Sequence, residues 1–228
     1  MTTEERIDEI ITSLNQGELI TPPSGDLGHR EFHRRCAAHV TVDGLWMEFG
    51  VYRGRTICNI AATTTKTVYG FDSFEGLHEH WDDANPKGVY SLGGSVPEGA
   101  IDGSNEENPG MYDSSPTRRT KPWPSNVQLV KGYFENTLPG FLADHPEPAA
   151  YLHIDSDLYS SCCTVLNHLK DRIVPGTLIV FDELIGYGEF RQHEIKSFAE
   201  FLNETGHSYQ VLYLQNPHNY GQVCVKIQ

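Results

Sequence analysis

One stretch constrains the fold of this chain more than any other: Leu45-Trp-Met-Glu-Phe-Gly-Val-Tyr-Arg-Gly-Arg-Thr-Ile57. Its first five residues are mostly apolar, carry Glu48 near their end, and predict a short buried parallel strand. Gly50 and Gly54 follow at a spacing that suits a tight turn into a helix beginning near Arg53. Glycines let the backbone approach a ligand closely, and the first amides of a helix offer donors and partial positive charge. The stretch therefore predicts a strand–turn–helix unit suited to holding a small ligand.

The glycine pattern narrows the choice of ligand. It is not the G-x-G-x-x-G fingerprint of dinucleotide sites, and it lacks the Gly-Lys-Ser/Thr of a phosphate loop. An acid followed by G-x-x-x-G instead suits a ligand with an amino group and little phosphate charge, such as S-adenosylmethionine. The same pattern also serves as a plain structural turn, so both interpretations stay open at this point.

Apolar runs and amphipathic segments alternate along the rest of the chain, which predicts an α/β fold with a doubly wound, mostly parallel sheet of seven strands. Besides residues 45–49, the predicted strands are 67–72, 127–132, 149–155, 177–182, 209–214 and 222–227. The last two strands are consecutive and predict an antiparallel addition at one side. Predicted helices are 3–14, 26–40, 134–142 (interrupted at Pro139), 160–173 and 190–205, the last one capped by Gly206.

The length of 228 residues predicts a single domain. Residues 1–44 precede the first strand and are expected to form a helical cap or a homodimer contact. Residues 75–126 are dense in Gly, Pro, Ser, Asp and Asn with interspersed aromatic residues, which favours a lid or substrate-facing insert. Its basic cluster, Arg118-Arg119-Thr-Lys121, is interpreted as a solvated turn.

Composition excludes several classes of partner. With 31 acidic against 17 basic residues, the net charge is −14, and no basic stripe is present to bind nucleic acid. No apolar run approaches the roughly 20 residues of a membrane span. Five scattered cysteines without metal-ligand spacing predict reduced core thiols. We therefore expect a cytoplasmic protein without nucleic-acid or membrane partners.

Acids stand at or near the end of four predicted strands: Glu48, Asp72, Asp155 and Asp182, with Asp157 and Glu183 close behind. In doubly wound sheets, ligands bind beyond the carboxyl ends of the strands, where the strand order reverses. Asp72 is placed to accept hydrogen bonds from the hydroxyl groups of a ribose. Glu48 could hold an ammonium group or a bridging water. Asp155 with Asp182 and Glu183 would offer oxygen ligands to Mg²⁺. A single acid at such a place could simply cap the next helix, but four such strand ends together are harder to explain by capping alone.

Five motifs in order carry a family resemblance: Glu48-Phe-Gly-Val-Tyr-Arg-Gly, Phe71-Asp-Ser-Phe-Glu-Gly-Leu, Val130-Lys-Gly-Tyr-Phe, His153-Ile-Asp-Ser-Asp-Leu-Tyr and Pro175-Gly-Thr-Leu-Ile-Val-Phe-Asp-Glu. From about Leu45 to Phe201 the chain resembles the macrocin O-methyltransferase (TylF-type) family. These are Rossmann-like class I enzymes that use S-adenosylmethionine, and usually Mg²⁺, to methylate sugar hydroxyls. The family's second acidic pair is typically Asp-Asp before an aromatic residue, whereas this chain has Asp182-Glu183-Leu184.

The resemblance implies an S-adenosylmethionine-dependent methyltransferase with a small hydroxylated acceptor. It implies metal ligation by Asp155, Asp182 and Glu183, with Asp157 as the base and His153 either as an alternative base or as a core histidine. The His193-Glu194 pair opens the last long helix, either as a solvated turn or at the pocket rim. Cofactor contacts are expected at Glu48, Gly50, Tyr52, Gly54, Thr56, Asp72, Ser73, Phe74, Lys131, Gly132 and Asp155.

Two other classes of function remain compatible with the sequence. One is a nucleotide-dependent sugar oxidoreductase on the same scaffold, against which the missing G-x-G-x-x-G argues. The other is a protein that binds the cofactor without turnover.

Overall fold

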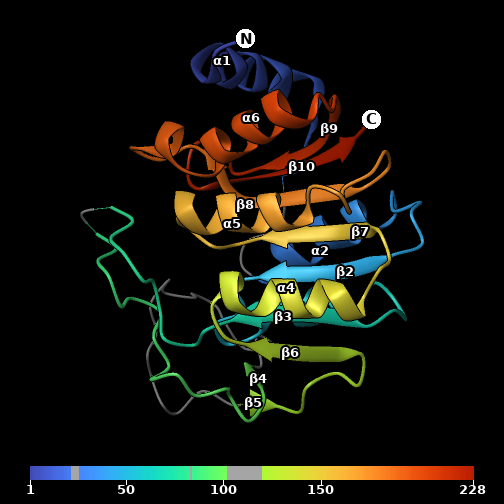
Figure 1. The fold of residues 1–228 in the computed structure, drawn as a ribbon, viewed down its shortest axis with the longest axis vertical. Coiled ribbons are helices and arrows are strands. Elements are labelled where there is room, and N and C mark those ends of the chain that lie inside the picture. The colour runs from blue at the N-terminus through green and yellow to red at the C-terminus, as the bar shows by residue number, and fades with distance from the viewer. Residues whose placement is uncertain (22–25, 83, 102–119) are drawn as a thin grey trace.

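The computed structural model describes residues 1–21, 26–82, 84–101 and 120–228. An eight-stranded sheet forms its centre (Figure 1). In spatial order the strands are β1 (Glu18–Leu19), β9 (Tyr209–Gln215), β10 (Gly221–Ile227), β8 (Leu178–Ile185), β7 (Ala149–Ile154), β2 (Leu45–Phe49), β3 (Val68–Asp72) and β6 (Val127–Lys131). β8, β7, β2, β3 and β6 run parallel, whereas β10 is antiparallel to both of its neighbours.

Helices cover both faces of the sheet, as a doubly wound fold requires. The helices are α1 (Thr3–Ser13), α2 (Asp26–Ala37), α3 (Arg55–Ala61), α4 (Phe134–Asp144), α5 (Tyr159–Leu169) and α6 (Glu194–Thr205), with 3₁₀ turns η1 (Leu14–Gln16) and η3 (Phe190–Gln192). One apolar core lies under α1, α4, α5 and α6, and a second lies under α2 and α3. The sheet thus separates two cores, and the predicted fold class is confirmed.

The chain reverses direction across the sheet between β2 and β7. From β2 it runs outward through β3 to β6, and then returns to β7 on the other side of β2. This reversal opens the crevice in which such sheets bind ligands. Side chains alternate across the strands. Glu48, His153 and Asp182 accordingly follow the buried residues Trp46, Tyr151 and Val180 on the face covered by α2 and α3.

Three details differ from the sequence-based expectation. The sheet has an eighth strand, β1, which pairs in parallel with β9. Pro139 does not interrupt α4. Because this proline is exposed, its ring faces solvent, and water can reach the carbonyl group that loses its partner. The last helix is split at His193, whose backbone (φ −113°, ψ −128°) separates η3 from α6. The Gly206 cap is left-handed, as predicted, with φ 74°.

The described parts of the 75–126 insert follow the carboxyl end of β3, and most of their residues are exposed or half-buried. They include the two-stranded pair β4 (Ala100–Ile101) and β5 (Thr120–Lys121). Trp81 is buried, and the Trp123 ring lies where a side chain on Gly54 would stand. Arg118 and Arg119 lie outside the described residues. None of the five cysteines forms a disulfide bond. Within the described ranges no helix combines the length and apolarity needed to cross a membrane.

Candidate active site

A cavity of about 580 Å³ opens at the carboxyl edge of the sheet and spans the reversal between β2 and β7. Its volume is in the range usual for small-molecule and cofactor sites. The predicted site residues that line it are Gly50, Tyr52, Thr56, Asp72, Ser73, Gly132, Asp155, Asp157, Asp182 and Glu183. Five others do not belong to the lining: Glu48, Gly54, Phe74, Lys131 and His153. Most of the predicted site residues therefore converge on one cavity, whereas these five lie outside its lining.

The glycine turn after β2 is built so tightly that Gly50 cannot be replaced without rearrangement. Gly50 has φ 95°, and a Cβ there would come within 1.7 Å of the Asp155 carbonyl oxygen. The Asp155 amide in turn donates to the Phe49 carbonyl at 2.9 Å. The glycine turn after β2 and the backbone of Asp155, the first residue after β7, are therefore held directly against each other.

Asp72 fixes the shape of the same turn. Its Oδ2 accepts the amides of Val51 (2.9 Å) and Tyr52 (2.6 Å), and its Oδ1 accepts the amide of Phe74 (2.7 Å). Tyr52 and Phe74 have positive φ values of 47° and 59°. Non-glycine residues held in this region mark sites that the surrounding structure keeps under strain. Carboxylate oxygens accept more than one bond each, so Asp72 can still meet a ligand from the cavity side.

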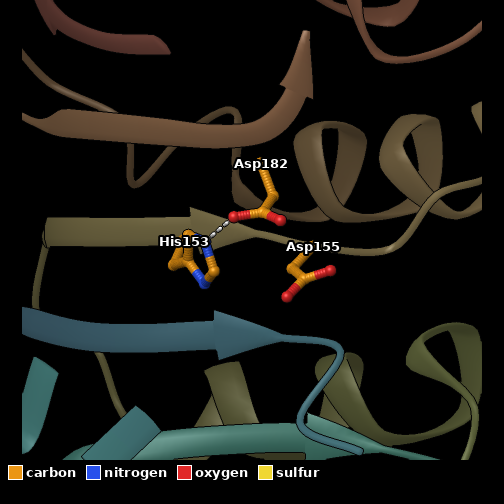
Figure 2. A group of neighbouring side chains, drawn as sticks. All are labelled: His153, Asp155 and Asp182. Atoms are coloured by element: carbon orange, nitrogen blue, oxygen red, sulfur yellow. Dashed lines mark hydrogen bonds and ion pairs between the residues drawn. The ribbon is translucent and has the colours of Figure 1, made fainter. Parts of the chain in front are cut away.

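A buried polar chain lies beneath the cavity floor. His153 has Nδ1 3.0 Å from Glu48 Oε1 and Nε2 3.3 Å from Asp182 Oδ1. Figure 2 shows the contact between His153 and Asp182, with Asp155 beside them. Gln222 of β10 also donates to Asp182 Oδ1. Both ring nitrogens of His153 are thus engaged below the floor, which supports the core-histidine interpretation of this residue.

The protonation of this chain follows from burial and pairing. Burial lowers the pKa of His153, but its hydrogen bonds to Asp182 and Glu48 outweigh this effect and raise its pKa well above the ordinary value. Burial raises the pKa of Glu48 to about 7, even though His153 opposes the rise. Burial also opposes ionisation of Asp182, yet its partner His153 brings the pKa of that carboxyl well below the usual range. The result is an imidazolium that holds an ionised Asp182 in place.

Two groups of side chains bring metal-type ligand atoms within 4.8 Å of one another: His153 with Asp155 and Asp182, and Asp155 with Asp157 and Glu183. Asp182 and Glu183 fall into different groups because consecutive residues of β8 point to opposite faces. The first group already uses His153 Nε2 in a hydrogen bond. The second group offers oxygen donors only, which is the donor set that a hard divalent cation prefers.

The second carboxylate group is short of positive charge. Burial, followed by repulsion from Asp182, raises the pKa of Asp155 and Glu183 well above normal and that of Asp157 to about 7. Glu183 Oε2 is buried without a hydrogen-bond partner. Carboxylates gathered in this way need either protons or a cation. The donors, their burial and the unsatisfied oxygen therefore fit a divalent ion.

The predicted His193–Glu194 pair is neither a solvated turn nor part of the cavity lining. Both residues are buried, and Glu194 Oε2 accepts the backbone amide of Glu183 at 3.3 Å.

Other residues of the site carry no local sequence signal. Trp81 and Gln222 line the cavity although they are 141 positions apart in the sequence. No local motif marks such residues, since only the folded sheet brings the insert and the last strand together.

Known proteins are similar to this chain in sequence or in structure. Mycinamicin III 3''-O-methyltransferase from Micromonospora griseorubida is 27% identical over 155 residues, which are 62% of this chain and 56% of that protein. The chain thus spans little more than half the length of this curated relative. The O-methyltransferase NovP is 18% identical, with a TM-score of 0.59 and coverage of 99% of both chains. The TDP-rhamnose 3'-O-methyltransferase CalS11 is 19% identical, with a TM-score of 0.53 and coverage of 99% of this chain and 86% of that one.

At such identities the solved structures establish the fold alone. The family described as "Methyltransferase domain" matches residues 47–184, which contain the glycine turn, Asp72 and all the clustered carboxylates. This match covers more than half of the chain, so the chain belongs to the methyltransferase-domain family.

Proposed function

We propose that this protein is an S-adenosylmethionine-dependent O-methyltransferase that acts, with Mg²⁺, on a hydroxyl group of a sugar-bearing or other small hydroxylated metabolite. The observation that carries the proposal is one cavity in which a strained glycine turn meets a buried carboxylate group. Methyl transfer requires the donor and the acceptor hydroxyl to be held close together and aligned, and a single cavity with these two features could hold both. Two of the similar proteins, mycinamicin III 3''-O-methyltransferase and the TDP-rhamnose 3'-O-methyltransferase CalS11, carry out this class of reaction by their names.

The cofactor would occupy the half of the cavity formed by β2, β3 and β6, which we call the cofactor half. Gly50 and Gly132 allow close approach of the backbone, Asp72 and Ser73 offer polar partners, and Thr56 stands in the first turn of α3. Glu48, Gly54, Phe74 and Lys131 would act from behind the lining. Bound there, S-adenosylmethionine would supply an electrophilic methyl group on its sulfonium.

A divalent ion would be held at the centre of the cavity. Asp155 and Glu183 would be ligands in the all-carboxylate group, with Asp182 approaching from the other side of Asp155. Such an ion would lower the pKa of an acceptor hydroxyl. His153 and Gln222 position Asp182 from below, without reaching the cavity centre themselves.

Asp157 is the residue proposed to take the proton from the acceptor. Its side chain lines the cavity, is 7% exposed, and has a pKa raised by burial to about 7. A base works best when its pKa lies near the working pH. Its backbone φ of 60° aims this short side chain at the cavity at the cost of strain.

Calorimetry with S-adenosylhomocysteine, with and without Mg²⁺, followed by transfer of labelled methyl to a glycoside panel, tests the function. We expect D155A to lose the Mg²⁺-dependent turnover while it keeps cofactor affinity, and D157N to lower kcat by roughly 100-fold or more. A protein that ignores S-adenosylhomocysteine would refute the proposal. Cofactor binding without any methylated product would favour a binding protein, and nicotinamide binding an oxidoreductase.

A further inference from the structure

The cavity extends past the carboxylates to a second half, which we call the acceptor half. It lies beside β8 and β10 and is lined by His29, Trp81, Asn216, Asn219, Tyr220 and Gln222. The cofactor contacts proposed above use none of these six residues, and only Gln222 already has another role, as a partner of Asp182. They come from α2, the insert, the β9–β10 turn and β10, so the sheet assembles this half from segments far apart in sequence.

An aromatic wall closes the acceptor half. The ring centroids of Trp81 and Tyr220 lie 5.7 Å apart. Tyr187 stacks on Tyr220, with ring centroids 5.1 Å apart and an angle of 10° between the ring planes. The turn that carries Tyr220 is docked closely, since a Cβ on Gly186 would lie 2.7 Å from the Pro217 carbonyl oxygen. A rigid aromatic surface with a few polar groups beside it is the usual lining for a small ring-shaped ligand.

The polar groups of this half suit hydroxyl groups. Gln222 is 2% exposed, its amide nitrogen is committed to Asp182, and its Oε1 has no hydrogen-bond partner. Two exposed amide side chains, Asn216 and Asn219, stand on the neighbouring turn. A buried acceptor left unpaired is costly, so the site favours a ligand that brings a donor to it.

The charges argue against a phosphorylated acceptor. Among the described lining residues the guanidinium groups are those of Arg53 and Arg55, and both belong to the turn and first residue of α3 in the cofactor half. The acceptor half borders Asp182 and Glu183 instead. A diphosphate is normally bound by arginine or lysine side chains, by helix amides or by Mg²⁺. The Mg²⁺ proposed above would lie among Asp155, Asp182 and Glu183, whose three negative charges exceed its two positive charges. In the described part of this half, none of its lining side chains is an arginine or lysine.

We infer that the acceptor half is a subsite for an uncharged glycoside, with Trp81 and Tyr220 against the sugar ring and Gln222 accepting a hydroxyl, and that it discriminates against nucleoside-diphosphate sugars. The inference rests on the proposed function and adds the class of acceptor. It separates this chain from CalS11, which is named for a TDP-sugar.

Ligand-observed saturation-transfer NMR on the full chain, saturated with S-adenosylhomocysteine and Mg²⁺, tests the discrimination. The ligands are methyl glycosides of common hexoses and 6-deoxyhexoses, each paired with the TDP form of the same sugar. We expect saturation transfer to the ring protons of at least one methyl glycoside, and affinity at least about tenfold weaker for its TDP partner. Equal or tighter binding of the TDP forms, or no glycoside binding, would overturn the inference.

Variants locate the subsite. W81A and Y220A should weaken glycoside binding by roughly tenfold and leave the affinity for S-adenosylhomocysteine unchanged. W81F keeps an aromatic face and should retain most of the glycoside affinity. N219R places a cation on the exposed turn and should raise the affinity for the TDP form. Glycoside binding that ignores both W81A and Y220A would contradict the assignment. If the wild-type chain does not bind S-adenosylhomocysteine at all, the proposed function itself is refuted.

Discussion

At the scale of single residues, the most consequential side chain is His153, because it lies between the fully buried carboxylate of Glu48 and the half-buried carboxylate of Asp182. Its nitrogens lie 3.0 Å from Glu48 and 3.3 Å from Asp182. Removing one partner from a buried charged network leaves the others uncompensated. His153→Leu should therefore lower the free energy of unfolding by about 3–5 kcal/mol, measured by urea denaturation.

The control for this variant is His168→Leu, at an exposed position on α5, which should change stability by no more than about 0.5 kcal/mol. Similar stabilities of the two variants would mean that the Glu48–His153–Asp182 chain contributes little to folding.

His33 gives a prediction with a defined sign in pH. It is fully buried, its Nδ1 lies 2.8 Å from the Tyr151 hydroxyl, and burial followed by the nearby His153 lowers its pKa well below the ordinary value. The unfolded chain therefore binds a proton below about pH 6.5 that the folded chain refuses. The stability that neutral His33 provides is present above this pH and is lost as the pH falls.

In His33→Gln this loss should be absent. The free energy of unfolding of the variant minus that of wild type should therefore increase by up to about 1.4 kcal/mol for each pH unit below pH 6.5. Urea midpoints at about pH 7.5, 6.5 and 5.5 measure the difference, with H168Q as the exposed control. A difference between H33Q and wild type that does not change with pH would show that His33 also takes up a proton in the folded state.

The sequence identified which acids gather at the sheet edge but not how each one is used. Asp72, Asp155, Asp157, Asp182 and Glu183 line the cavity as expected from strand ends. Glu48 stands one position before its strand ends, and alternation turns it toward the face where α2 covers it. Only the packing of that helix decides its burial, and no pattern around Glu48 records it.

At the scale of elements, the glycine turn after β2 is the part least tolerant of change. A Cβ at Gly50 would meet the Asp155 carbonyl, and its φ of 95° is unfavourable for other residues. Gly50→Ala should cost about 2–4 kcal/mol of stability and weaken S-adenosylhomocysteine binding at least tenfold, measured by thermal melting and calorimetry.

Gly140→Ala is the matched control. Gly140 lies inside α4, where a Cβ meets nothing within 4 Å, so the exchange should stabilise the helix by about 0.5–1 kcal/mol and leave binding unchanged. Equal behaviour of the two glycine variants would show that the close approach at Gly50 is unimportant.

Sequence patterns predicted the seven longer strands because each has at least five residues of apolar or alternating character. β1 escaped prediction because two exposed residues carry no period, and its place in the sheet depends on pairing with β9, almost 200 positions later. The break at His193 was also missed, since helical periodicity continues across it while the backbone does not. For β1, a tertiary contact rather than local propensity determined the structure.

At the scale of the whole molecule, the net charge of −14 should govern behaviour in salt. Mutual repulsion of surface carboxylates destabilises the compact state and is screened within a Debye length of about 8 Å at physiological ionic strength. The Tm should therefore rise by a few degrees between low salt and about 0.15 M NaCl. Fluorescence anisotropy with a labelled DNA duplex should show no binding at either salt level, whereas salt-sensitive binding would reveal a basic surface beyond the described residues.

The three amides that converge on Asp72 have a consequence for how a ligand is captured. They fix the loop at Val51, Tyr52 and Phe74 before any partner arrives. The entropy of ordering these residues is thus lost during folding and not at the encounter. Association at this end of the cavity should consequently be rapid and nearly free of rearrangement, and whatever slow motion accompanies turnover should originate elsewhere in the chain.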